Sequence, residues 1–244
     1  PAAEAGIQGG DIVTKLEGLA LATDGTMADY CDILRTQGSD APLAVQVLRF
    51  STNEILQGTL NEDAPLEVAQ SLGSQLEEEE PAPDQGGPTT YEYTYVQDDS
   101  GVLSVEVPTD WGDVDGSALT LPDGTTAAQV TAATSLDEYR LSFEVSGVQI
   151  VSFDGFHDPD GTIDLLTSGI GVDNACEGGT REDYDDGLYT GRFEHYTCGD
   201  AVFVAIAATP ENQAFTVYVN VQVLNDADYE ALDRVIQSFI VSTD

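Results

Sequence analysis

Basic side chains are almost missing from this sequence of 244 residues. It contains 7 lysine and arginine residues against 45 aspartate and glutamate residues, which gives a formal net charge of −38. Nucleic acids and anionic membrane surfaces are both polyanions that bind proteins through lysine and arginine. The scarcity of these residues argues against nucleic acid and anionic membranes as partners.

Long apolar runs are missing as well. None approaches the ~18 residues that a membrane-spanning helix needs, so we expect no membrane span. The only histidines are His157 and His195, and no Gly-Asp-Ser-Gly-Gly motif accompanies them. We therefore predict no catalytic residues of the Ser-His-Asp type and no cofactor in this chain.

Cysteine occurs three times. Cys176 and Cys198 flank a segment rich in Gly and Asp, which we interpret as a loop closed by a disulfide worth roughly 3 kcal/mol. Such a bond indicates an oxidising, extracytoplasmic compartment: secreted, periplasmic or at the cell surface. A zinc site is disfavoured because only His195 lies near either cysteine. The third cysteine, Cys31, is expected to pack as a small apolar residue.

The surplus of acid predicts adaptation to salt. Self-repulsion at this net charge destabilises the compact state at low ionic strength. At ~1 M salt the Debye length falls to ~3 Å, which removes most of the repulsion. We expect a salt-adapted, halophilic protein. An acidic extracellular protein with no need for salt is the alternative.

The first sixty residues have an ordered pattern of turns and elements. Residues Pro1 to Gly18 predict a short helical turn, a Gly-Gly turn and a strand over 12–16. A helix over 27–37 follows, with a stop at the next glycine. Two further strands are predicted over 43–50 and 54–60.

This order, opening on Pro-Ala-Ala-Glu-Ala-Gly, resembles the second half of the PDZ domain carried by HtrA-like serine proteases. Gly9 and Glu17 depart from the family pattern, which commonly has Pro and Asn there. The resemblance implies a truncated PDZ-like domain over 1–61 whose opening strands, and an upstream protease domain, precede Pro1. It also implies a groove for peptides or unfolded protein C-termini, with weak binding in this truncated form. The candidate peptide-binding residues are Met27, Tyr30, Cys31 and Leu34.

Two basic residues on the predicted strands, Lys15 and Arg49, are candidates to attract a peptide carboxylate. Solvent-facing strand positions are the preferred interpretation. Beyond them, residues 62–90 contain acidic but no basic side chains and predict a flexible linker. A short helix over 66–76 is the alternative for its first part.

Residues 91–244 predict a second domain. Ser135 and Glu138 fit a capping box for a helix reaching Glu144. Asn225 caps a closing helix with one apolar stripe. Strands are expected over 91–95, 103–107, 148–153, 188–196, 201–209 and 215–224, the last three antiparallel. The result is an antiparallel sheet with helices against it.

The second domain resembles, more loosely, the PsbP-type fold. The motif Ser104 to Trp111 and the closing Ser238-Phe239 carry the resemblance, and we expect Trp111 in the core. What the resemblance implies is an interaction domain with no shared catalytic residues.

Two acidic segments suggest calcium, but neither matches the EF-hand spacing. For Asp158 to Asp164 a turn at Pro159 and Gly161 is preferred, and for Glu182 to Asp186 a solvated loop. We therefore predict no metal site.

The predicted fold class is α+β: a partial PDZ-like domain joined by an acidic linker to a PsbP-like domain. The predicted function is that of a non-catalytic, peptide-binding or protein-binding regulatory region of a secreted HtrA-like serine protease. The alternative is a salt-adapted extracytoplasmic accessory or surface protein with no protease role.

Overall fold

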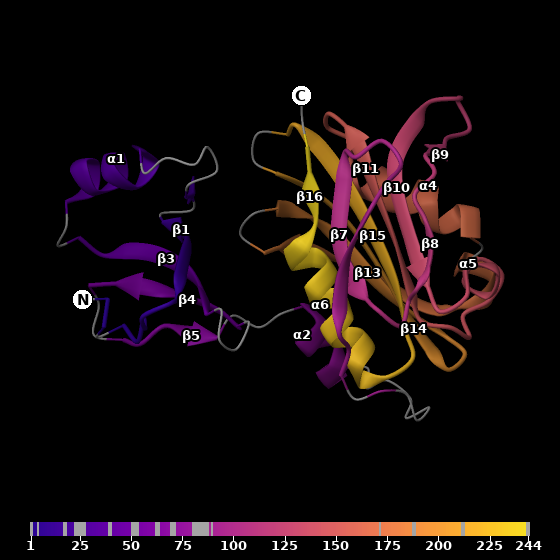
Figure 1. Cartoon of the computed structure of the whole chain (residues 1–244), viewed down its shortest axis with the longest axis horizontal. Coiled ribbons are helices and arrows are strands. Elements are labelled where there is room, and N and C mark those ends of the chain that lie inside the picture. The colour runs from indigo at the N-terminus through magenta and orange to yellow at the C-terminus, as the bar shows by residue number, and fades with distance from the viewer. Residues whose placement is uncertain are drawn as a thin grey trace. The chain divides into compact units, whose positions relative to one another are not determined.

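The chain forms two compact units, Pro1–Gln70 and Ser71–Asp244, in a computed structural model (Figure 1). The structure describes residues 2–3, 5–16, 19–21, 28–38, 41–49, 54–61, 64–68, 72–79, 88, 90–170, 172–186, 189–210 and 213–242. Each unit has its own hydrophobic core and is described by itself.

The first unit is an antiparallel sheet with the order β2-β1-β3-β4-β5. Helix α1 (Ala28–Gln37) supplies Ile33 to the core, where it joins Leu16, Val47 and Leu56. Alternation along the strands buries one face. The strands are β1 (Ile12–Leu16), β2 (Leu19–Ala20), β3 (Leu43–Arg49), β4 (Glu54–Leu60) and β5 (Glu67–Val68).

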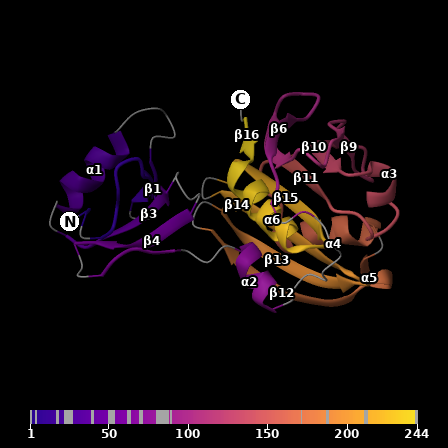
Figure 2. The ribbon, with the colours of Figure 1, turned by 60° about the horizontal axis from the view of Figure 1, so that its bottom comes forward.

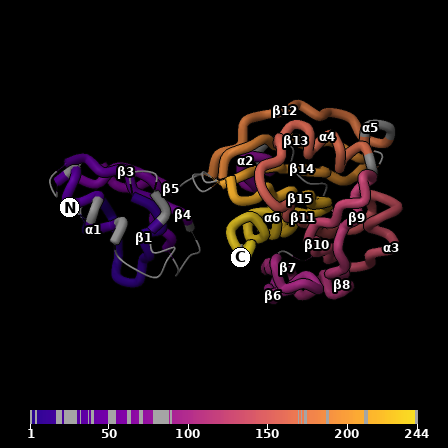
Figure 3. The backbone as a smooth tube through the Cα atoms, turned by 90° about the horizontal axis from the view of Figure 1, so that it is seen from above, coloured from indigo at the N-terminus to yellow at the C-terminus, as the bar shows by residue number. Residues whose placement is uncertain are grey.

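The second unit is built on an antiparallel sheet with the order β12-β13-β14-β15-β11-β10-β8, and β9 pairs with β10. A smaller sheet has the order β16-β7-β6 (Figures 1 and 3). The strands are β6 (Tyr93–Gln97), β7 (Leu103–Pro108), β8 (Asp113–Asp115), β9 (Leu119–Thr120), β10 (Thr126–Ala133), β11 (Gly147–Asp154), β12 (Glu177–Asp185), β13 (Tyr189–Cys198), β14 (Ala201–Pro210), β15 (Phe215–Val223) and β16 (Ile240–Val241). The helices are α2 (Leu72–Glu79), α3 (Leu136–Tyr139), α4 (Pro159–Ile170), α5 (Val172–Ala175) and α6 (Asp226–Ser238).

The two faces of the large sheet carry separate cores. One face packs against α6 and β7 and has a wholly apolar centre that includes Trp111, Val219 and Leu232. The other face packs against α4 and contains Phe203, Tyr218 and Ile163 (Figure 2). Strands β14 and β15 are buried on both faces, which explains the nearly continuous apolar sequence of β14; in β15, valines alternate with Tyr218, Asn220 and Gln222.

The predicted fold class is wrong. The described structure consists mainly of antiparallel sheets and does not form a partial PDZ-like domain followed by a PsbP-like domain. Strands β10 and β12 were not expected, because β10 is rich in alanine and β12 in Gly and acid, both poor strand formers. Pairing with neighbouring strands overrides these weak local preferences.

Several local predictions are corrected as well. The segment from Pro159 is the helix α4 rather than a turn, and the helix after Ser135 ends at Tyr139 rather than Glu144. The acidic segment between the two cysteines is the hairpin β12–β13 rather than a solvated loop. Within the range predicted as a linker, the structure forms β5 and α2, and Leu76 of α2 is buried in the core of the second unit.

Other local predictions are confirmed. The three antiparallel strands after residue 188 pair in succession as β13, β14 and β15. The Asn225 side chain accepts from the Ala227 amide and begins α6 with a capping box. Trp111 is fully buried, as expected.

Candidate functional site

The predicted peptide-binding residues are divided between the core and the surface of the first unit. Tyr30 and Leu34 are half-buried and pack against the core, while Cys31 is exposed. The expectation that Cys31 packs as an apolar residue is therefore wrong. Met27 lies outside the described residues. The described part of α1 thus offers one exposed member of the predicted groove, Cys31, while Tyr30 and Leu34 pack against the core.

The two basic strand residues are not solvent-facing. Lys15 is buried, with 5% of its surface exposed. Arg49 pairs with Asp11 at 2.9 Å and donates a hydrogen bond of 2.7 Å to the Gly6 carbonyl. Its guanidinium holds the pKa of the Asp11 carboxyl below its usual value. The Arg49 charge therefore fixes the turn before β1 and is already neutralised.

The opposite face of the first sheet carries a row of apolar side chains. Ile12 is the cross-strand partner of Leu48, and Leu48 is the partner of Ile55. Cross-strand partners point to the same face of a sheet. None of the three belongs to the described core. Ile12 is 50% exposed, and the other two are half-buried. We call Ile12, Leu48 and Ile55 the apolar row.

The second unit contains a polar row on the sheet face that packs against α4. Register places six residues of successive strands side by side across β10, β11, β15, β14, β13 and β12. They are Thr131, Gln149, Asn220, Ala205, Glu194 and Arg181. Five of the six carry polar side chains, on the face that also carries an apolar cluster including Ala207, Phe203 and Tyr218.

Hydrogen bonds connect the first half of the polar row. The Asn220 amide donates to Gln149 at 2.9 Å, and Gln149 donates to Gln129 at 3.0 Å. The buried Tyr139 hydroxyl donates to Asn220, whose amide also lies 3.3 Å from the Tyr218 hydroxyl. Burial raises the pKa of both tyrosines well above the usual value. Both hydroxyls therefore stay protonated: that of Tyr139 donates to Asn220, and that of Tyr218 accepts from the Asn220 amide.

Ion pairs connect the second half. Arg181 Nε lies 2.8 Å from the buried Glu194 carboxylate, which also accepts from the Tyr196 hydroxyl. The same guanidinium reaches Asp160 at 3.2 Å and Asp164 at 2.8 Å on α4. The hydrogen bond to Glu194 raises the pKa of Arg181 above its already high value. Two of the carboxylates considered for calcium, Asp160 and Asp164, therefore bind Arg181, and this arginine connects α4 to the sheet.

A second buried network surrounds Asp228 at the start of α6. Its carboxylate is fully buried and accepts from the Tyr91 hydroxyl at 2.7 Å and the Ser146 hydroxyl at 2.6 Å. It also accepts from the amides of Leu224 at 2.8 Å and Asn225 at 3.2 Å. Burial raises the pKa of this carboxyl despite the hydrogen bonds, which lower it. Asp228 joins three distant segments and is part of the framework.

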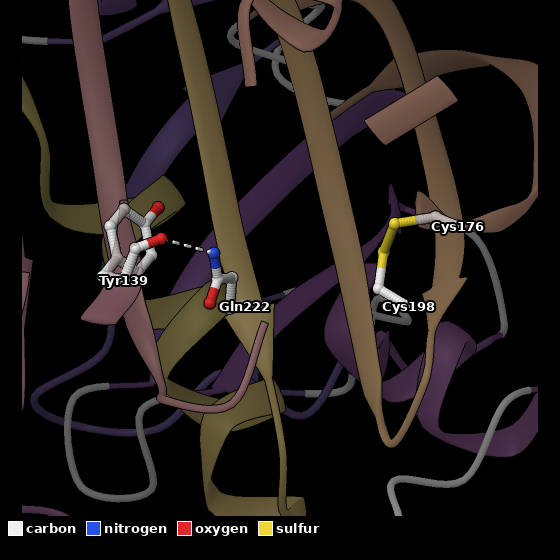
Figure 4. Close-up of a disulfide and its surroundings, with 4 residues drawn as sticks. All are labelled: Tyr139, Cys176, Cys198 and Gln222. Atoms are coloured by element: carbon white, nitrogen blue, oxygen red, sulfur yellow. Dashed lines mark hydrogen bonds between the residues drawn. A yellow bond between two sulfur atoms is a disulfide. The ribbon is translucent and has the colours of Figure 1, made fainter. Parts of the chain in front are cut away.

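The disulfide between Cys176 and Cys198 joins the two strands of the β12–β13 hairpin at their open end (Figure 4). An open depression of about 520 Å³ lies beside it, lined by Phe143, Glu144, Asp200 and Cys198 among others. Figure 4 also shows Gln222 donating to the Tyr139 carbonyl, at 3.1 Å. The depression is wide open and holds no buried polar group, so it lacks the features of a catalytic pocket.

Among the described residues, no group of three or more His, Cys, Asp or Glu side chains is placed to hold a metal ion. In the same part of the chain, no helix is long and apolar enough to cross a membrane. The acidic side chains of α4 and β12 instead meet the arginines of the hairpin.

Comparison with known proteins adds little. No protein family matches the sequence, and no curated protein matches it. Among solved structures, the chain is similar to the Ran-binding protein Mog1p from Saccharomyces cerevisiae. That likeness has 11% sequence identity and a TM-score of 0.38, and it covers 62% of this chain and 96% of Mog1p. At such values it says nothing about the function of this chain.

The polar side chains described above form hydrogen bonds and ion pairs within the protein. The side chains of the apolar row, in contrast, do not belong to the described core. The sequence contained a signal for this row: Ile12, Leu48 and Ile55 are apolar at strand positions that alternate with the core positions. Recognising it required the register of three strands, which the sequence alone does not supply. The apolar row is the candidate functional site of the first unit.

Proposed function

We propose that this chain is a non-catalytic, protein-binding region that works outside the cytoplasm. The first unit would bind extended or unfolded protein segments, and the second unit would contact a partner. The apolar row carries this proposal, because one half-exposed and two half-buried aliphatic side chains gathered across three strands mark a surface for protein contact. The disulfide supports the extracytoplasmic location.

The association with a secreted HtrA-like serine protease is part of the proposal. It rests on the motif from Pro1 to Gly18 and on the elements that follow it. The matching experiment is a casein-cleavage assay on this chain and on a longer chain that includes the residues encoded upstream. Cleavage by the longer chain alone supports the association.

Replacing Ile12 by aspartate tests the apolar row. Binding of a fluorescent, reduced and carboxymethylated protein is measured by anisotropy in ~1 M salt, where long-range repulsion is screened. We expect Ile12→Asp to weaken the already weak binding roughly tenfold, because a half-exposed isoleucine loses on the order of 1.4 kcal/mol of apolar contact.

The matched control is Cys31→Asp, which places the same charge on the exposed side of α1. It is expected to change binding by no more than about twofold, as surface substitutions usually do. A large loss in Cys31→Asp with none in Ile12→Asp would move the site to the predicted helix groove and reject the apolar row.

A second candidate function is favoured by the net charge of −38. A salt-adapted accessory or surface protein with no protease role would need this charge for hydration and solubility, with no upstream enzyme. Absence of casein cleavage by the longer chain favours this candidate over the protease association.

A further inference from the structure

The large sheet of the second unit ends at β12 (Figures 2 and 3). Its inner side pairs with β13 between Glu177 and Asp185, with one irregularity at Gly179. On its outer side, the described residues place no further strand. A strand at the end of a sheet presents backbone amides and carbonyls that another extended chain can pair with.

One part of this edge is regular enough to accept a strand. The register shifts between Gly178 and Thr180, and the Tyr196 ring packs against Gly179. From Thr180 to Asp185 the pairing with β13 runs without interruption. This six-residue stretch is the open part of the edge, and a length of five to six residues is the usual size of a strand.

The charge of the edge has one sign. Glu177, Glu182, Asp183 and Asp185 are all exposed on β12. The only basic residue of the strand, Arg181, is held by Glu194, Asp160 and Asp164. Arg192 of the neighbouring strand pairs with Asp183 and approaches Asp160. The arginines are therefore neutralised from within, and the edge is left with a negative surplus.

We propose that the β12 edge binds an extended, lysine-rich or arginine-rich segment of a partner protein as an additional strand. Backbone hydrogen bonds supply the pairing, as in other complexes formed by strand addition. Alternation places the partner's side chains beside Glu182 on one face and, on the other, beside Asp185 and the Asp183 carboxylate that already pairs with Arg192. Opposite charges at such cross-strand positions stabilise a strand pair.

A second copy of this chain does not fit the same edge. Pairing of β12 with another β12 sets acidic side chains against acidic side chains, and like charges directly opposite destabilise a strand pair. The charge thus selects a basic partner and rejects self-association. This inference rests on the interaction role proposed for the second unit, and its test leaves the apolar row of the first unit untouched.

The test uses the full chain, labelled with ¹⁵N, and an acetylated eight-residue peptide of alternating lysine and threonine at 0.1 M salt. The expected result is a set of amide shifts centred on residues 180–185. The same peptide with N-methyl groups on alternate amides keeps its charge but loses its donors, and it is expected to bind roughly tenfold more weakly or worse. An alternating glutamate and threonine peptide is expected not to bind.

A pair of variants separates the edge from the general acidity of the chain. Glu182→Lys is expected to weaken binding of the lysine peptide roughly fivefold, because an attractive cross-strand pair becomes repulsive. Glu92→Lys makes the same change at another exposed acidic position of the second unit and is expected to leave binding nearly unchanged. Circular dichroism confirms that both variants fold.

Any one of the following outcomes overturns the proposal. The first is equal binding of the N-methylated peptide, which indicates attraction by charge alone. The second is an equal loss in Glu92→Lys and Glu182→Lys. The third is an absence of shifts in β12, or a dimer paired through β12 in sedimentation experiments. If the lysine peptide does not bind the edge while the reduced and carboxymethylated protein still binds the chain, this inference alone is rejected and the proposed function stands.

Discussion

Replacing Asp228 by alanine is expected to lower the free energy of unfolding by about 4 kcal/mol or more. The substitution leaves the Tyr91 and Ser146 hydroxyls and the Leu224 and Asn225 amides without their acceptor. Each buried donor left unsatisfied costs roughly 1–3 kcal/mol. For a protein of this size such a loss corresponds to a fall in Tm of roughly 10 °C. Urea denaturation and calorimetry measure both quantities.

Asp228→Asn is the matched control. One amide oxygen can still accept from the Leu224 and Asn225 amides, and the amide nitrogen can donate to the Tyr91 hydroxyl, which is also an acceptor. We expect this variant to lose less than half of the stability lost in Asp228→Ala. A loss below ~1 kcal/mol in Asp228→Ala would show that the network does not hold α6 to the sheet.

Raising the salt concentration from 0.05 M to 2 M is expected to raise the Tm by on the order of 10 °C, or about 3 kcal/mol of stability. The reason is the net charge of −38, since screening removes repulsion between acidic side chains that no basic residue compensates. In the second unit the described arginines already pair with carboxylates, as Arg181 and Arg192 show. The 7 lysine and arginine residues of the chain are too few to compensate the charge of its 45 aspartate and glutamate residues.

Differential scanning calorimetry in KCl measures this effect, and sucrose provides the control. Sucrose stabilises by exclusion from the protein surface but does not screen charge. We expect most of the gain to occur in KCl below ~1 M, where the Debye length falls fastest, and a smaller gain in sucrose. Equal Tm values at the two salt concentrations would reject salt adaptation.

Much of the second unit could be predicted from its sequence. The apolar run of β14 and the alternating residues of β15 specify buried strands, and Asn225 specifies the start of α6. These signals are local: a run of apolar residues, or a cap before an amphipathic helix. These signals do not depend on residues elsewhere in the chain, so the elements that they predict are present in the folded structure.

The prediction failed where distant partners decide the structure. The acidic strand β12 has a poor strand sequence and forms because β13 pairs with it and Glu194 and Asp160 neutralise Arg181. Helix α4 begins at Pro159, where a turn was equally compatible with the sequence. Its position is fixed by packing against β14 and β13. The short motifs on which the family resemblances were based did not reveal these contacts, which is why the predicted fold class was wrong.

The candidate binding surfaces depend on register for the same reason. The three members of the apolar row are 36 and 7 residues apart in sequence and meet only through the pairing of β1, β3 and β4. Two residues that the PDZ resemblance assigned to the peptide groove, Tyr30 and Leu34, pack instead against the core of the first unit. An amphipathic pattern identifies the buried face of an element but does not say which exposed face binds a partner.

We expect this chain to bind other proteins without any chemical action on them. The most direct measurement mixes the full chain with a fluorescent unfolded protein in ~1 M salt and follows anisotropy and gel electrophoresis in the same sample. We predict a rise in anisotropy that saturates at high chain concentration, with the labelled protein intact after prolonged incubation. New fragments of the labelled protein, or anisotropy that never rises, would contradict the account.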